Sequence, residues 1–154
     1  IRAPERLASM TLVGAPGMSF DGITPADNFL WPEEERARRM VHDPDLAARM
    51  SQPPQSEEES LRALSNWAAL ARLAWSPRWH DPQLDKWAHR LTMPVQVVWG
   101  REDQLFPVAY ADAYAQRLPN ARALIVEGCG HLVHIEKPEE LAAAVTTFAE
   151  ERAA

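Results

Sequence analysis

The sequence PVQVVWGRED, at residues 94–103, joins an apolar run to a polar loop. Its valines and Trp99 are residue types that are enriched in strands, so we predict a buried strand over residues 94–99. Gly100 ends the run, and Asp103 follows in the loop. The stretch therefore predicts a strand with a carboxylate just beyond its carboxyl end.

A second strand is predicted over residues 121–126, and the loop after it, Gly128 to His131, carries an imidazole. A helix predicted over residues 107–118 joins the two strands, which implies that they are parallel. The carboxyl ends of parallel strands meet at one edge of a sheet, where open α/β folds bind their ligands. We therefore expect Asp103 and His131 to lie close together, as two members of a nucleophilic triad.

Apolar spacing, glycine, proline and capping residues predict further elements and an α/β fold with a parallel sheet. An earlier buried strand covers residues 10–13. Ser56 is expected to cap a helix that continues to Trp75, while Glu59 bonds back to the helix start. One face of this helix carries Leu64, Trp67, Ala68, Ala71 and Trp75. The other predicted helices cover residues 32–41, 44–51, part of 78–90, and 138–152.

The composition is that of an ordinary globular protein, with 46% hydrophobic and 25% charged residues among 154. The net charge is -6, so we expect no nucleic-acid partner and a cytoplasmic location. No apolar stretch approaches the roughly 18 residues of a membrane span, and we expect no membrane partner. The single cysteine, Cys129, excludes an internal disulfide and a cysteine-rich metal site.

The strand with its Gly-Arg-Glu-Asp loop, the second strand with its Gly-His loop, and the following Glu136-Lys137-Pro138 resemble the C-terminal half of the α/β-hydrolase superfamily. The resemblance implies parallel strands with flanking helices and an inserted helical cap. It divides the chain into a core strand and loop at 1–20, a cap at 21–91, and a C-terminal α/β core at 92–154. It also implies that the chemistry needs neither a metal nor an organic cofactor.

By this resemblance, Asp103 is the triad acid and His131 is the general base. A neutral imidazole takes the proton of the nucleophile and returns it to the leaving group. The carboxylate fixes the tautomer of the imidazole and stabilises the imidazolium. Phe106 and Leu132 lie beside these two residues in the sequence, so we expect them to line the pocket of a small-molecule substrate. We expect His134 to pack or form a hydrogen bond near the site rather than to act as a second base.

The Gly-x-Ser-x-Gly nucleophile elbow of the family is absent from these 154 residues. Cys129 lacks the elbow frame, and we interpret it as a small residue in a tight loop. We expect the nucleophile to lie upstream of this chain, and the chain alone to be inactive. The strand at 10–13 would then present an open edge, so we expect the chain to accompany a missing N-terminal half or to self-associate.

Three interpretations of the function remain open at this point. The first is an esterase-like hydrolase of a small carboxylic ester or related carbonyl compound, acting through a Ser-His-Asp triad. The second keeps the acid and the histidine but uses an aspartate nucleophile, as in epoxide hydrolases and dehalogenases. The third is a hydrolase-like binding module without catalysis.

Overall fold

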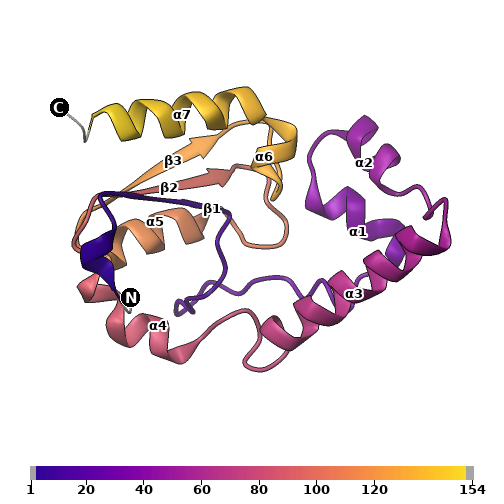
Figure 1. Cartoon of the computed structure of the whole chain (residues 1–154), viewed down its shortest axis with the longest axis horizontal. Helices are drawn as coiled ribbons and strands as arrows, with labels where there is room; N and C mark the ends of the chain where they lie inside the picture. The colour runs from indigo at the N-terminus through magenta and orange to yellow at the C-terminus, as the bar shows by residue number, and fades with distance from the viewer. Residues whose placement is uncertain (1–2, 152–154) are drawn as a thin grey trace.

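The computed structural model describes residues 3–151 and contains a three-stranded parallel sheet (Figure 1). The strands are β1 (Met10–Val13), β2 (Val95–Gly100) and β3 (Ala121–Val126), in the spatial order β1-β2-β3. The parallel register sets Val98 of β2 opposite Val13 on one side and Leu124 on the other. The three predicted strands and their parallel arrangement are confirmed.

Strand β2 is buried along its whole length because helices cover both faces of the sheet. Val95, Val97 and Trp99 pack in one apolar cluster with side chains of α5 (Ala109–Arg117). The alternate residue Val98 packs in a second cluster, which reaches α6 and α7. Figure 1 shows α5 and α7 on opposite sides of the sheet, as expected of a three-layer α/β fold.

The edge strands differ from the prediction in their burial. All four residues of β1 are half-buried rather than buried. Within residues 3–151, β1 pairs with β2 alone, so its outer edge has no neighbouring strand. This position explains the exposure, because a buried strand needs cover on both faces and at both edges.

Four helices lie between β1 and β2, and Figure 1 shows α1 and α2 beyond the arrowheads of β2 and β3. Trp31, Ala74 and Trp79 from this region share a single apolar cluster with Trp99 and Phe106. The predicted division into cap and core remains a prediction. The elements of this region are α1 (Glu33–Met40), α2 (Pro44–Met50), α3 (Glu57–Ala74), α4 (Pro82–Trp87) and a 3-10 turn (Ala88–Arg90).

Helix α3 begins as predicted but presents a different face. Ser56 Oγ accepts a hydrogen bond from the Glu59 amide at 3.2 Å, while the Glu59 carboxylate accepts from the amide of Gln55 rather than of Ser56. Leu64 and Trp75, which we expected on the apolar face, are 66% and 57% exposed. The buried side of α3 lies instead at its C-terminal end, where Ala74 packs in the main cluster.

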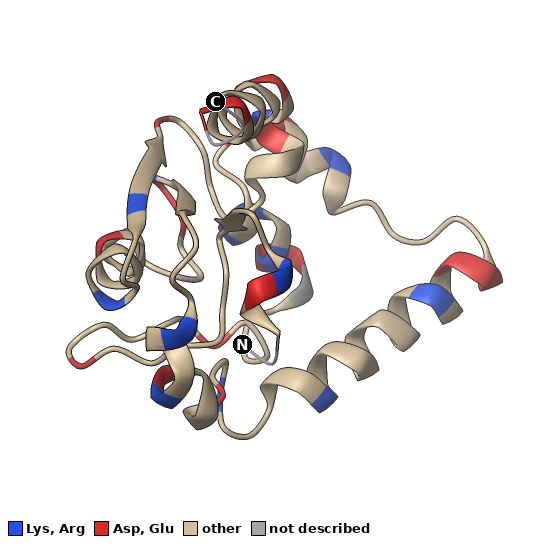
Figure 2. Ribbon diagram, turned by 60° about the vertical axis from the view of Figure 1, so that its left-hand side comes forward, with Lys and Arg blue, Asp and Glu red and all other residues tan. Residues whose placement is uncertain are grey.

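The chain ends in two helices, α6 (Val133–Glu136) and α7 (Pro138–Glu150). The short α6 was not predicted, and the expected helix end at Arg152 lies outside the described residues. Over residues 3–151, no helix has the length and apolar character required to cross a bilayer. Figure 2 shows acidic and basic positions interspersed on the ribbon, with the acidic first turn of α3 at one end of that helix.

Candidate active site

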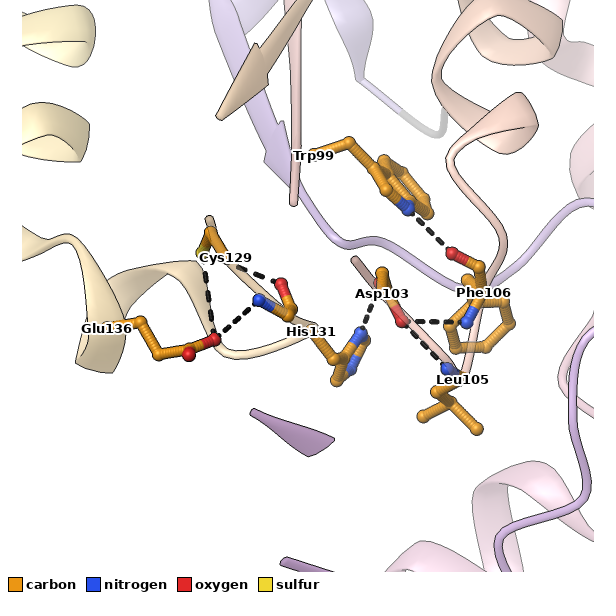
Figure 3. Close-up of polar contacts among 8 residues, drawn as sticks. Trp99, Asp103, Leu105, Phe106, Cys129, His131 and Glu136 are labelled. Atoms are coloured by element: carbon orange, nitrogen blue, oxygen red, sulfur yellow. Dashed lines mark hydrogen bonds and ion pairs between the residues drawn. The ribbon is translucent and has the colours of Figure 1, made fainter. Parts of the chain in front are cut away.

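Asp103 lies in the turn after β2, and its side chain is fully buried. Its Oδ1 atom accepts hydrogen bonds from the backbone amides of Leu105 at 2.8 Å and Phe106 at 2.9 Å. Its Oδ2 atom lies 2.9 Å from Nδ1 of His131 (Figure 3). The turn thus fixes one oxygen of the carboxylate and directs the other at the histidine.

His131 lies in the loop after β3, and its side chain is 15% exposed. A carboxylate only accepts hydrogen bonds, so Nδ1 carries the hydrogen and Nε2 of the neutral ring is left as an acceptor. The backbone amide of His131 donates to the carbonyl oxygen of Met40 at 2.9 Å. Nε2 therefore lies on the side of the ring away from Asp103, where it can accept a proton.

The two loops meet at glycines that leave no room for a side chain. A Cβ atom at Gly100 would collide with the carbonyl oxygens of Cys129 and Gly130. Glu102 adds two hydrogen bonds between the loops, because its amide donates to the Cys129 carbonyl at 3.0 Å and its carboxylate accepts from the Cys129 amide at 2.9 Å. The loops that carry Asp103 (the acid loop) and His131 (the base loop) are therefore held together mainly by backbone contacts.

Glu136 is a polar residue of this site that the sequence did not single out for a role. Its Oε2 atom accepts from the Gly130 amide at 2.6 Å and from the Cys129 thiol at 3.7 Å (Figure 3). Its Oε1 atom accepts from the amides of His42 and Asp43, at 2.6 and 2.9 Å. The only available signal was its position two residues before Pro138, which does not reveal partners 94 residues away.

A model of the alpha/beta hydrolase fold family matches residues 1–138. The chain belongs to the α/β-hydrolase family. This match confirms the resemblance to the family. The parallel sheet with helices on both faces agrees with the fold that the resemblance implies.

Two curated proteins and one solved structure illustrate what this chain is similar to. The 2-hydroxymuconate semialdehyde hydrolase of Pseudomonas putida is 30% identical over 160 residues, a match to 96% of this chain and 56% of that protein. Monoacylglycerol lipase ABHD6 of Rattus norvegicus is 36% identical over 59 residues, 38% of this chain and 18% of the lipase. The chain therefore spans only part of the length of each relative.

One structural neighbour is the 2-hydroxy-6-oxo-6-phenylhexa-2,4-dienoate hydrolase from Rhodococcus sp. strain RHA1. It superposes with a TM-score of 0.65 at 20% identity, over 95% of this chain and 56% of that chain. At this identity the likeness shows the fold alone.

Cys129 is fully buried in the loop directly before His131. Burial, followed by the nearby Glu136 carboxylate, raises the pKa of the thiol to about 12. The thiol therefore stays protonated at neutral pH, and the thiolate is the nucleophilic form. The geometry fits the interpretation of Cys129 as a small residue in a tight loop.

The two predicted pocket residues lie in different surroundings. Phe106 is buried, and its ring packs against Trp79 and Tyr110 and lies 5.6 Å from the His131 ring between centroids. Leu132 instead borders an open pocket of about 520 Å³ that is lined by α1, the end of α2 and the residues after it. Their role in binding a substrate remains a prediction.

Several other residues lie outside the direct contact between Asp103 and His131. His134 is exposed on α6, which contradicts the expectation that it packs beside the site, while the alternative of a hydrogen bond near the site stays a prediction. Trp67, Trp75 and Trp79 surround the Phe29 ring. Among residues 3–151, no group of three His, Cys, Asp or Glu side chains has the arrangement of a metal site.

Proposed function

We propose that this chain supplies the acid and the base of an α/β hydrolase that cleaves a small carboxylic ester or a related carbonyl compound. Asp103 orients the imidazole, and Nε2 of His131 takes the proton of the nucleophile. The nucleophile belongs to an elbow outside these 154 residues. The observation that carries the proposal is the 2.9 Å contact of His131 Nδ1 with an Asp103 carboxylate whose other oxygen is already held by two amides.

In the proposed reaction the nucleophile attacks the carbonyl carbon of the substrate while His131 removes its proton. The imidazolium then donates that proton to the leaving group, and the Asp103 carboxylate stabilises the positive charge in between. Water repeats the attack on the covalent intermediate and regenerates the enzyme. Burial of Asp103 suits this role, because an electrostatic interaction is stronger away from water.

The names of the relatives bear on the substrate class. The Pseudomonas protein that matches 96% of this chain is named for the hydrolysis of 2-hydroxymuconate semialdehyde, and the rat protein for that of monoacylglycerol. Both are small carbonyl compounds. We therefore include a 2-hydroxymuconate semialdehyde-like substrate beside simple esters in the proposed range.

The test compares variants of a protein that contains both these 154 residues and the proposed nucleophile. Its substrates are an aryl ester, a monoacylglycerol, 2-hydroxymuconate semialdehyde and an epoxide. His131→Ala is expected to lower kcat by at least about 10⁴-fold, because no base remains. Asp103→Asn is expected to lower it by about 10³- to 10⁴-fold, because the histidine then favours the wrong tautomer.

The matched control is His134→Ala, which removes an exposed histidine three residues from His131 and should leave the rate unchanged. An unchanged rate in His131→Ala would remove His131 from the mechanism. Turnover of the epoxide alone would favour the aspartate nucleophile instead. The 154-residue chain by itself is expected to show no turnover of any of these substrates.

A further inference from the structure

The carboxylate of Glu136 collects hydrogen bonds from two parts of the chain that are far apart in sequence. On one side it accepts from the consecutive amides of His42 and Asp43, in the turn between α1 and α2. On the other side it accepts from the Gly130 amide and the Cys129 thiol, directly before His131. Both oxygens are therefore engaged, each by donors from one segment.

These contacts are not an ordinary helix cap. Glu136 is the last residue of α6, and its carboxylate accepts hydrogen bonds from groups that lie outside α6 and α7. A side chain that caps its own helix bonds to the first amides of that helix. The carboxylate here serves instead as a bridge between the base loop and a turn in the predicted cap.

The loop before His131 and the α1–α2 turn also contact each other directly, in addition to the hydrogen bonds through Glu136. The His131 amide donates to the Met40 carbonyl at 2.9 Å. A Cβ atom at Gly130 would lie 2.9 Å from the Met40 carbonyl oxygen and from Cα of Val41. This backbone contact fixes the loop against the turn. The Glu136 carboxylate strengthens the contact, because hydrogen bonds to an ionised group are stronger than those between neutral groups.

We propose that Glu136 is a positioning residue that fixes the His131 loop against the α1–α2 turn, so that the orientation of the imidazole depends on the seating of that turn. This inference rests on the proposed role of His131 as the base. Residues 40–43, Glu136 and residues 129–131 then form one unit, which we call the base clamp. If the α1–α2 turn opened, the imidazole of His131 would become less well fixed, while the two amides that hold Asp103 would stay in place.

The first test measures the base clamp without any turnover. Amide hydrogen exchange and ¹⁵N spectra of the histidine rings are recorded on the full 154-residue chain, for the wild type, Glu136→Ala and Glu136→Gln. Glu136→Ala is expected to speed exchange of the His42, Asp43 and Gly130 amides by at least about 10-fold, because their shared acceptor is gone. The ring nitrogen signals of His131 should move toward an average of the two tautomers.

Glu136→Gln keeps the shape of the side chain but has one accepting oxygen in place of two. It is expected to protect the amides on one side of the clamp only, which keeps the test informative if Glu136→Ala does not fold. Glu139→Ala is the matched control, since it removes a carboxylate from the exposed first turn of α7 and should change neither signal. Unchanged Gly130 exchange and unchanged His131 signals in both Glu136 variants would overturn the proposal.

The second test measures kcat and KM in the enzyme that contains the nucleophile. Glu136→Ala is expected to lower kcat by about 10- to 100-fold, the size of effect that a misplaced catalytic group produces, with a smaller change in KM. Faster exchange with an unchanged kcat would overturn the positioning role. Absence of turnover in the wild type counts against the proposed function, while the exchange data still decide whether the base clamp exists.

Discussion

The two oxygens of the Asp103 carboxylate have separate partners. Two backbone amides donate to one oxygen, and His131 contacts the other. Both residues could be predicted from the sequence because each follows an apolar run that ends in a glycine or a glycine-rich loop. Glu136 could not be predicted in the same way. Its donors are placed by the tertiary fold, and no local pattern encodes a contact across 94 residues.

The buried thiol of Cys129 gives a prediction about stability at high pH. Its pKa is raised from 9.0 to about 12, so the folded protein keeps a proton that the unfolded chain releases from about pH 9 upward. The unfolded state then binds fewer protons, and the free energy of unfolding should fall as the pH rises from 9 toward 12. Denaturant titrations across this range measure the slope.

Cys129→Ala is the comparison that isolates this effect. The variant should lose stability less steeply than the wild type between pH 9 and pH 10. Above pH 10 the buried Tyr114 adds a slope of the same sign in both proteins, because its pKa is raised from 10.0 to about 12. Parallel stability curves for the two proteins between pH 9 and pH 10 would contradict the prediction.

Among the elements, α3 shows where sequence patterns succeed and where they fail. Its start was predictable because a serine cap followed by acidic residues satisfies free amides locally and suits the positive end of the helix dipole. Its buried face was not. The helix touches the rest of the molecule mainly near its C-terminal end, so apolar residues in its first half, such as Leu61 and Leu64, remain exposed.

The cap of α3 supports a prediction at this scale. Ser56→Ala removes the oxygen that accepts the Glu59 amide, and it should destabilise the first turn by about 1 kcal/mol. Local amide exchange over residues 57–60 measures the change. Ser60→Ala is a suitable control, because that hydroxyl donates to the carbonyl oxygen of Ser56 and its loss leaves the bond from the Glu59 amide to Ser56 Oγ in place. Equal exchange in Ser56→Ala and the wild type would show that the cap adds nothing.

At the scale of the whole molecule, the outer strands β1 and β3 each leave one edge of the sheet unpaired among residues 3–151. The outer edge of β1 carries the backbone groups that do not face β2. Met10 and Gly14 donate their amides toward β2, so the alternating pattern of a strand directs the Thr11 amide outward. An edge of this kind is a template for another strand.

We therefore expect the isolated 17.3 kDa chain to associate with itself as its concentration rises. Light scattering during size-exclusion chromatography measures the mass. Thr11→Pro should shift the equilibrium toward the monomer, because it removes an outward amide without breaking a bond to β2. A single 17.3 kDa species at all concentrations, with β1 ordered, would contradict this expectation.

The glycine at position 100 has a consequence for how this site can change. The separation of the acid loop from the base loop is set by main-chain atoms in contact, since a methyl group at Gly100 would already strike the carbonyl oxygens of Cys129 and Gly130. Substitution of small side chains therefore cannot change the separation of the two loops in small steps. Substitutions that reshape this site have to act on the side chains around the two loops, because the separation of the loops stays constant.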